Sequence, residues 1–471
     1  MSSWRFWITG SCLALFLAPA ALAEETANPI SYYQQIRPIL QAHCQGCHQP
    51  AKAGGEYVMT GFDTLLAGGE SGSQAIIPGK VDESYLIELI TPTDGAAEMP
   101  KGKKPLADSD RELIAQWIAQ GAKDDTPASA TVRYDQDNPP RYGAAPVITA
   151  LDYAPNGELL AVSGYHEVLV HKADGSELVG RLVGLSERIE SLKFSPDGKW
   201  LAVTGGLPAR MGEVQVWDVA QRTLKFSIPV TYDTIYGASW SPDGKLISFG
   251  CSDNTTRAIN AETGEQVLYS GSANDWVLDT VFSTDGSHLI AVGRDMTAKL
   301  IEVGTQRFID NITSITPGAL KGGITSVDRH PTKDEILVGS ADGVPKTFRI
   351  YRTEARKIGD DHQRIRHFEA MPGRVFSVEY SPSGEQVLAG SSYNGKGEVR
   401  LYENESGKLV WKFETTPVYS VTYRSDGQQI AVAGFDGTVR LLDAAQGTLQ
   451  HEFVPVPLST KEPVAANPDQ P

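Results

Sequence analysis

The sequence contains little cysteine, no long apolar run beyond its first residues, and no excess of basic residues. Cysteine occurs at four of 471 positions, and only Cys44, Cys47 and Cys251 follow residue 23. Because Cys251 stands alone, a zinc site made of two cysteine pairs is excluded. No segment after residue 23 approaches the roughly 18 apolar residues of a membrane span. The formal net charge of −16 argues against nucleic-acid binding, which requires a basic surface.

The first residues have the parts of a secretory signal peptide. A basic residue, Arg5, precedes an apolar run from Leu13 to Leu17, and the small-residue site Ala21-Leu22-Ala23 precedes Glu24. The apolar run is too short for a membrane span. We therefore expect a signal peptide over residues 1–23 and a soluble mature protein that is periplasmic or otherwise exported.

Two cysteines two residues apart are followed directly by a histidine, in Cys44-Gln45-Gly46-Cys47-His48. This pattern is typical of c-type haem attachment. The two thiols would add across the two vinyl groups of one haem, and His48 would ligate the iron from one side. A zinc knuckle or a redox Cys-x-x-Cys pair is the alternative, but no second ligand pair follows. The motif predicts one covalent haem c, with Cys44 and Cys47 as its attachment points.

Helical patterns flank this motif over residues 24–126, which we expect to form a small all-α domain. Apolar residues recur at three- and four-residue steps around residues 33–40. Shorter helical patterns follow over residues 83–90 and 109–122, and Leu113, Ile114 and Trp117 form an apolar face in the last of them. An N-terminal and a C-terminal helix around a haem loop is the arrangement of small, class I-like cytochromes c.

The second axial ligand of the iron is expected to be a methionine or a histidine, and Met99 and Met59 are the main candidates. Met99 precedes a proline in a loop between two helices, whereas Met59 lies closer to the cysteines and also suits a core position. Residues 31–122, with Pro78-Gly79 and Met99-Pro100, resemble the planctomycete-type cytochrome c domain. In that family the methionine before proline is the distal ligand, which implies His48 and Met99 here. Such a pair fills both axial positions, which favours electron transfer over haem catalysis.

Residues 127–146 are rich in Asp, Pro and Ala and predict a linker. Beyond it a turn of the Ser-Pro-Asp-Gly kind recurs about seven times, near the period of propeller blades. The turns lie at residues 154–157, 195–198, 241–244, 283–286, 330–333, 381–384 and 424–427. Residues 147–455 resemble the WD40 family, with Trp217-Asp218 as the name dipeptide. The resemblance implies an all-β, seven-bladed propeller after the helical domain, and residues 456–471 are predicted to be a disordered tail.

Two features of the repeats are candidates for binding. Asp253, Asp295, Asp342 and Asp436 recur before the third strand of several copies. They would form either an acidic ring for a cation or hydrogen bonds within turns. Residues 351–374 are a long insertion with several arginines, which would dock a partner protein or an anionic ligand on one face.

These features predict an exported mono-haem c-type cytochrome that transfers electrons to a redox partner protein, with the propeller as a protein-docking platform. Two alternatives stay open. One is a periplasmic oxidoreductase whose propeller carries the substrate site while the haem relays electrons, and the other is a haem-based redox or gas sensor. No nucleophile with an adjacent base is recognisable in the repeats, which favours a carrier over a catalyst.

Overall fold

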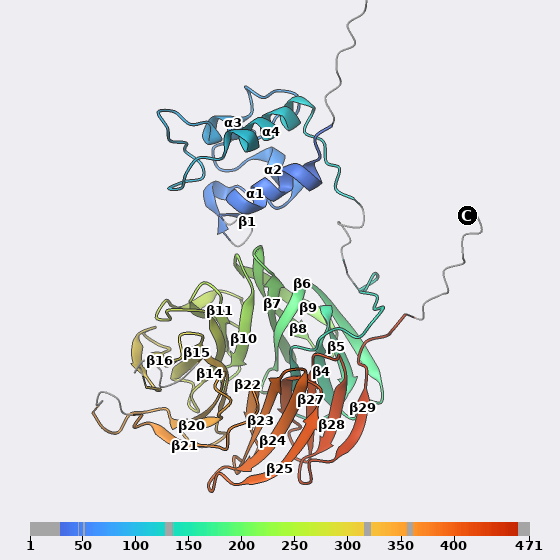
Figure 1. Cartoon of the computed structure of the whole chain (residues 1–471), viewed down its shortest axis with the longest axis vertical. Coiled ribbons are helices and arrows are strands. Elements are labelled where there is room, and N and C mark those ends of the chain that lie inside the picture. Colours follow the sequence, from blue (N-terminus) through green and yellow to red (C-terminus); the bar gives the residue numbers. More distant parts are fainter. Residues whose placement is uncertain are drawn as a thin grey trace, which may run out of the picture.

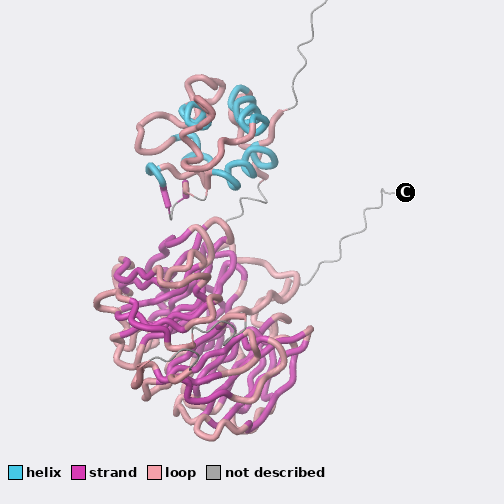
Figure 2. Tube along the Cα trace, turned by 60° about the vertical axis from the view of Figure 1, so that its left-hand side comes forward, coloured by secondary structure: helices cyan, strands magenta, loops and turns pink. Residues whose placement is uncertain are grey.

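The computed structural model describes residues 29–45, 47–49, 52–127, 134, 136–314, 322–355 and 361–459. Within these residues, the helices belong to the N-terminal part of the chain and nearly all strands follow it (Figure 1, Figure 2). Most of the regular secondary structure in the described residues is antiparallel sheet, which confirms the all-β part of the predicted fold. The predicted signal peptide over residues 1–23, and residues 460–471 of the predicted tail, lie outside the described residues.

The N-terminal part consists of short helices joined by loops. They are the π-helix η1 (Tyr32–Ile36), α1 (Arg37–His43), the 3-10 helix η2 (Gly54–Glu56), α2 (Phe62–Ala67), α3 (Tyr85–Ile90) and α4 (Asp108–Ala119). A ribbon of β1 (His48–Gln49) and β2 (Lys52–Ala53) follows α1. The hydroxyl of Ser31 accepts a hydrogen bond from the Gln34 N–H (2.9 Å) and so caps η1. Pro38 is tolerated because it falls in the first turn of α1, where no helical donor is lost.

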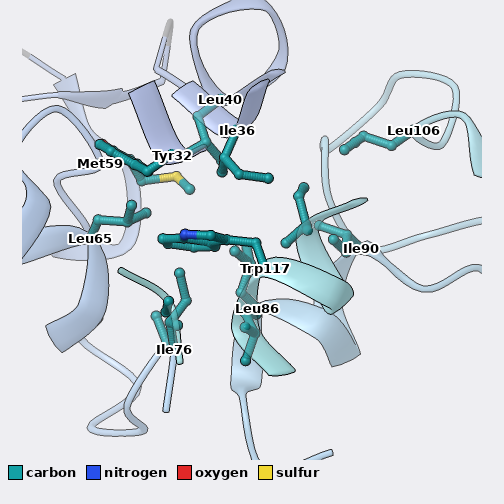
Figure 3. Close-up of a cluster of buried hydrophobic side chains, with 14 of the residues drawn as sticks. Tyr32, Ile36, Leu40, Met59, Leu65, Ile76, Leu86, Ile90, Leu106 and Trp117 are labelled. Carbon is teal, nitrogen blue, oxygen red and sulfur yellow. The ribbon is translucent and has the colours of Figure 1, made fainter. Parts of the chain in front are cut away.

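Trp117 of α4 lies in the middle of a hydrophobic core that belongs to this part alone (Figure 3). Its side chain is 1 % exposed. The indole ring stacks on Tyr32 (5.5 Å between centroids) and meets the edge of Phe62 (6.3 Å). Its Nε1–H donates to the carbonyl of Lys123 (3.1 Å), so the one polar atom of the ring is satisfied. The helices are thus held together by their own core.

The rest of the described chain forms five four-stranded sheets and one seven-stranded sheet, all antiparallel. The seven-stranded sheet contains β3 (Leu151–Tyr153), β4 (Leu159–Ser163), β5 (Tyr165–Lys172), β6 (Leu178–Phe194), β7 (Trp200–Leu207), β8 (Met211–Asp218) and β9 (Thr223–Thr231). The next two sheets are β10 (Ile235–Trp240), β11 (Leu246–Cys251), β12 (Thr256–Asn260), β13 (Gln266–Ser270), and β14 (Val277–Phe282), β15 (His288–Gly293), β16 (Ala298–Glu302), β17 (Phe308–Asn311).

The three remaining sheets follow in chain order. They are β18 (Ile324–Arg329), β19 (Glu335–Ser340), β20 (Lys346–Arg349), β21 (Arg364–His367); β22 (Arg374–Tyr380), β23 (Gln386–Tyr393), β24 (Lys396–Glu403), β25 (Leu409–Thr415); and β26 (Val418–Tyr423), β27 (Gln429–Gly434), β28 (Val439–Asp443), β29 (Leu449–Phe453). The last sheet is complete with its own fourth strand, because β29 pairs with β28.

The inner strands of the sheets contact one another in sequence and close a ring. β6 contacts β10, β10 contacts β14, and so on to β26, which contacts β3. At this closure the Leu151 N–H donates to the Ser420 hydroxyl (3.1 Å). The long strand β6 pairs first with β5 and then with β7, which is why a single sheet of seven strands forms there. This arrangement is that of a propeller of WD40 type.

The recurrent turns have the chemistry that their sequence predicts. Between β6 and β7, the Asp197 carboxylate accepts hydrogen bonds from the Ser195 hydroxyl (2.5 Å) and the Lys199 N–H (3.0 Å). Gly198 has a φ of 71°, a conformation that favours glycine. The corresponding turns at residues 241–244 and 283–286 repeat these bonds.

Candidate functional site

All four predicted site residues line one cavity of about 460 Å³ in the N-terminal part, which we call the N-terminal pocket. Cys44, Cys47, His48 and Met99 contribute to its wall. Leu86, Leu89, Ile90 and Leu106 give the wall its apolar portion. The structure therefore brings together residues that are separated by about fifty positions in the sequence.

The chain after α1 turns sharply and directs the motif to this pocket. The Cys44 N–H still bonds to the Leu40 carbonyl (2.9 Å), as the last bond of α1. The Cys47 and His48 N–H groups then both donate to the Cys44 carbonyl (3.0 and 3.1 Å). This turn places Cys44, Cys47 and His48 on the wall of one cavity, because the chain doubles back within three residues.

The imidazole of His48 is oriented by Tyr57. Its Nδ1 lies 3.3 Å from the Tyr57 carbonyl oxygen, and the two rings are 5.5 Å apart. A carbonyl can only accept, so Nδ1 carries the proton and the neutral ring keeps a lone pair on Nε2. The Tyr57 hydroxyl is fixed in turn by the Leu65 carbonyl (2.7 Å). The contact with Tyr57 thus orients the ring so that Nε2, rather than Nδ1, would be the atom to ligate a metal.

The two thiols differ in environment. Cys44 is partly buried, and burial together with the neighbouring Cys47 raises the pKa of its thiol to about 11. Cys47 is exposed, and neither residue forms a disulfide. Cys44 is therefore a thiol rather than a thiolate at neutral pH.

Met99 and Met59 both line the N-terminal pocket, so the structure does not separate the two candidates by location. Met59 is 1 % exposed and packed in the core, and its carbonyl accepts a hydrogen bond from the Gln45 amide (3.0 Å). Met99 is only partly buried and is held by a backbone bond to the Leu89 carbonyl (2.9 Å). Sequence reasoning missed Gln45 and Tyr57, which support the wall, since nothing in their local pattern marks them.

A second cavity, of about 490 Å³, is the central channel of the propeller, and acidic side chains stand in its wall. Asp279, Asp328 and Glu379 each accept a hydrogen bond from the backbone of the next sheet's inner strand, and Asp152, close by, accepts one from β6 of its own seven-stranded sheet. The bonds run to Asp152 from Phe194 (2.7 Å), to Asp279 from Val327 (2.9 Å), to Asp328 from Tyr380 (2.7 Å) and to Glu379 from Tyr423 (3.3 Å). These bonds join neighbouring inner strands around the channel.

Lys193 lies among these acids, with its Nζ 3.2 Å from an oxygen of Asp152. We call Asp152, Lys193, Asp279, Asp328 and Glu379 the channel cluster. Attraction by Asp152 raises the Lys193 pKa, so the amine stays charged. Sequence reasoning missed these residues, although an acid directly before the aromatic residue that leads into the turn recurs in Asp152-Tyr153 and Glu379-Tyr380.

Titration of the channel cluster makes the stability of the propeller depend on pH. Burial, reinforced by Asp328 and Asp152, raises the Glu379 pKa to about 8, against about 4.3 in an unfolded chain. The folded state thus holds a proton that the unfolded state releases, so this contribution is full below about pH 4 and is lost as the pH rises through about 8. We expect the melting temperature to fall between about pH 6.5 and about pH 8.5, and to fall less in Glu379→Gln.

Differential scanning calorimetry of the full chain measures how the melting temperature of the propeller changes with pH. Glu414→Gln is the matched control, because Glu414 is an exposed acid paired with Lys412 on an outer strand. An equal pH slope in wild type, Glu379→Gln and Glu414→Gln would contradict the assignment.

The four recurrent aspartates form turns rather than a cation ring. Each carboxylate accepts a backbone N–H two residues on and pairs with a cation four residues on. The ion pairs are Asp253 with Arg257, Asp295 with Lys299, Asp342 with Lys346 and Asp436 with Arg440, each at 2.6 Å. The backbone donors are Thr255, Thr297, Val344 and Thr438. The prediction of turn hydrogen bonding is confirmed.

The basic insertion does not present a continuous cationic patch in the described residues. Arg352 pairs with Asp310, and Arg364 pairs with Asp361 (3.3 Å). Arg356 and Lys357 lie outside the described residues. Arg374 stands on the wall of a further cavity, between β22 and its neighbours, and also borders the central channel.

Comparison with curated proteins finds relatives at low identity. A protein named Periodic tryptophan protein 2, of Arabidopsis thaliana, is 25 % identical over 311 residues, which are 65 % of this chain and 33 % of the relative. Eukaryotic translation initiation factor 3 subunit I of Aspergillus terreus is 26 % identical over 65 % of this chain and 89 % of its own length. The same subunit of Candida glabrata is 25 % identical over 48 % of this chain and 68 % of its own length. The chain thus spans a third of the first of these relatives.

These relatives overturn the predicted function. Their names are those of a translation initiation factor subunit and a periodic tryptophan protein, and not of exported cytochromes. The predicted electron transfer to a redox partner is therefore wrong, as are the alternatives of a periplasmic oxidoreductase and a haem-based sensor. The predicted periplasmic or exported localisation is wrong on the same finding. Among the residues that the structure describes, no helix is long and apolar enough to cross a membrane.

The predicted haem c, with its iron, is corrected as well. Haem is no part of the names of these relatives. In the described part of the chain no three or more His, Cys, Asp or Glu side chains gather where they could hold a metal ion. A family model described as Planctomycete cytochrome C does match residues 44–102, about an eighth of the chain, so the resemblance of this segment stands.

The larger match lies in the propeller. The model of the family described as Nucleolar protein 10-like, N-terminal domain, a β-propeller, matches residues 183–466, which is more than half of the chain. Its range covers most of the ring of sheets, from the second half of β6 onward. The chain belongs to the family of Nucleolar protein 10-like N-terminal β-propeller domains.

Proposed function

We propose that this chain is a protein-docking scaffold built on a seven-bladed propeller. The seven-stranded sheet counts as two blades that share β6, and the five four-stranded sheets supply the others. The observation that carries the proposal is that the acids of the channel are committed to holding the blades together, while aromatic side chains are exposed elsewhere on the ring. Relatives named as a subunit of a translation initiation factor also support membership of an assembly.

Chemical crosslinking of the tagged full chain in its native host, followed by mass spectrometry, tests the docking function. We expect crosslinks from the propeller to a small set of partner proteins, reproduced in independent preparations. Their absence, with crosslinks only within the chain, would overturn the proposal.

We propose the domain division that the sequence indicates, with a helical domain over residues 24–126, a linker over 127–146 and the propeller over 147–455. The hydrophobic core around Trp117 contains only residues before 123, which supports a separate first domain. The strands of the propeller pair only with one another in the described residues. Val456 is buried, and Leu458 bridges to Tyr142, so a few residues on either side of the ring pack on it.

We further propose that the N-terminal pocket is a binding site in which Cys44 and Cys47 attach a group and His48 and Met99 ligate its metal. The shared cavity and the fixed tautomer of His48 support this assignment. The mass of the purified full chain should then exceed that of its polypeptide, and both cysteines should resist iodoacetamide after unfolding in guanidinium.

Cys251 is the internal control for this measurement. It is 0 % exposed, and burial raises its thiol pKa, so we expect it to be labelled only after unfolding. The added mass identifies the group, and Cys44→Ser or Cys47→Ser should weaken its retention. A chain of polypeptide mass whose Cys44 and Cys47 are labelled as fully as Cys251 would overturn the assignment.

A further inference from the structure

One side of the propeller has an aromatic cluster that its own core does not use. The rings of Phe376, Tyr419 and Phe435 lie 5.2 to 6.3 Å apart between centroids. Phe435 is 46 % exposed, and the neighbouring Tyr393 is 58 % exposed. Large apolar side chains that cluster in solvent commonly mark an interaction surface.

Phe376, Phe435 and Tyr393 line a cavity of about 700 Å³, which we call the aromatic groove, while Tyr419 lies behind them on the central channel. Phe376, Tyr393, Pro417 and Phe435 are in its wall, together with Arg374. Most of its lining residues belong to β22, to the hairpin between β23 and β24, and to the chain directly before β26 and after β27. Its volume suits a few residues of peptide rather than a folded surface.

The walls of the groove are rigid. Tyr393 pairs with Lys396 across a two-residue hairpin, in which Asn394 and Gly395 have φ values of 48° and 78°. Such a turn matches the twist of the flanking strands. The Phe435 N–H donates to the Pro417 carbonyl (3.1 Å), which fixes the opposite wall. Binding of a ligand would therefore cost the protein little conformational entropy.

The charges around the groove leave one cation free. Asp342 on its rim is neutralised by Lys346 (2.6 Å). Asp436 is neutralised by Arg440 (2.6 Å). Arg374 is exposed, and across the described ranges its guanidinium has neither an ion pair nor a hydrogen bond. Among the residues that line the groove, Arg374 is thus the cation without an ion pair, and it stands beside apolar walls.

We propose that the aromatic groove docks an extended peptide segment of a partner protein, in which one carboxylate is flanked by apolar or proline residues. The carboxylate would pair with Arg374, which binds planar anions through parallel N–H donors. The apolar residues would lie on Phe376 and Phe435. A run of acidic residues, or a nucleic acid, fits poorly because the chain carries a formal net charge of −16.

This inference rests on the proposed docking function and adds the site and the chemistry of the ligand. Its test is a selection of random peptides displayed on phage against the immobilised full chain. We expect enriched peptides to share one Asp or Glu beside aromatic, aliphatic or proline residues. Fluorescence polarisation then measures the affinity of the best labelled peptide for each variant.

Phe435→Ala and Arg374→Glu should each weaken binding by roughly thirtyfold or more, which is the loss expected for an interface anchor. Replacing the carboxylate of the peptide by an amide should have a similar effect on wild type and none on Arg374→Glu. Phe308→Ala and Arg307→Glu are matched controls, because both residues are exposed at the outer strand β17. Their affinities should equal that of wild type.

The same selection separates failure of this inference from failure of the docking function. Enriched peptides that bind Phe435→Ala and Arg374→Glu as tightly as wild type would overturn the groove while leaving a docking propeller. A selection without enrichment would also overturn it. If peptides bind only after residues 460–471 are removed, the groove is the binding site of the chain's own C-terminal segment and the proposal is wrong. If the chain forms dimers that Phe435→Ala abolishes, the groove binds a second copy of the chain and the proposal is wrong.

Discussion

Trp117→Ala should unfold the N-terminal helical domain and leave the propeller folded. The substitution removes a 1 % exposed side chain that stacks on Tyr32 and meets Phe62. Truncating a buried tryptophan costs about 3–5 kcal/mol. A domain of this size is stable by only about 5–15 kcal/mol, and small domains lie at the low end of that range. The loss therefore consumes most of the stability of the helical domain.

Hydrogen–deuterium exchange resolved by peptide mass spectrometry measures this directly. Peptides from residues 32–122 should lose protection, while the strands of the propeller keep theirs. Trp276→Ala is the matched control, because Trp276 lies at the surface of the propeller beneath Arg294 (4.7 Å from the ring centroid). Equal loss of protection in both parts of the chain would contradict the separate core and the proposed domain division.

Lys299→Met should destabilise the propeller by about 3–5 kcal/mol, because it leaves a buried carboxylate without its cation. The side chains of Lys299 and Asp295 are 5 % and 6 % exposed, and their charged atoms are 2.6 Å apart. Asp295 also accepts the N–H groups of Asn274 (3.0 Å) and Thr297 (3.2 Å). The pKa of Asp295 is lowered despite its burial, since Lys299 and these donors favour the charged form.

Urea unfolding monitored by the propeller's tryptophan fluorescence gives the free energy of unfolding. The double variant Asp295→Asn with Lys299→Met should recover more than half of the loss, because no buried charge remains. Lys412→Met is the control. It breaks an exposed pair with Glu414, and such pairs contribute about 0–1 kcal/mol. A loss in Lys299→Met no larger than in Lys412→Met would show that the buried pair is not a structural element.

The repeats could be predicted because their chemistry is local. The turn at residues 195–198 is stabilised by Ser195, Asp197 and Gly198 themselves, so the sequence of four residues determines it. The same holds for Asp295 and Lys299, which lie four positions apart on one hairpin. The channel cluster could not be predicted in this way. Its members come from inner strands that are far apart in the sequence, and only the packing of β3 against β6 brings Lys193 to Asp152, 41 positions away.

For the N-terminal pocket, the sequence predicts which residues lie together but not the chemistry of the site. Cys44, Cys47 and His48 lie within five residues of the sequence, and Met99, about fifty positions later, lines the same cavity. The chemistry inferred from that pattern, a haem c and electron transfer, was nevertheless contradicted by the named relatives. A short motif defines which side chains can meet, but the function of the whole chain depends on the larger domain that follows it.

The exposed aromatics could not be located from the sequence either. Phe376, Tyr419 and Phe435 are on different strands and turns, and each alone reads as an ordinary core residue of a β-rich domain. Of the three, Phe435 is exposed because it directly follows the end of β27, while Phe376 and Tyr419 are partly buried beside it. The apolar pattern of the sequence predicts the strands. Which strand ends remain exposed to solvent depends on how the sheets assemble into the ring.

Native mass spectrometry of the tagged full chain, purified gently from its host, tests the scaffold function most directly. The account predicts a complex of fixed stoichiometry with at least one other protein, and loss of a peptide-docked partner from Phe435→Ala but not from Phe308→Ala. Recovery of the wild-type chain alone, across preparations at low and moderate salt, would contradict it.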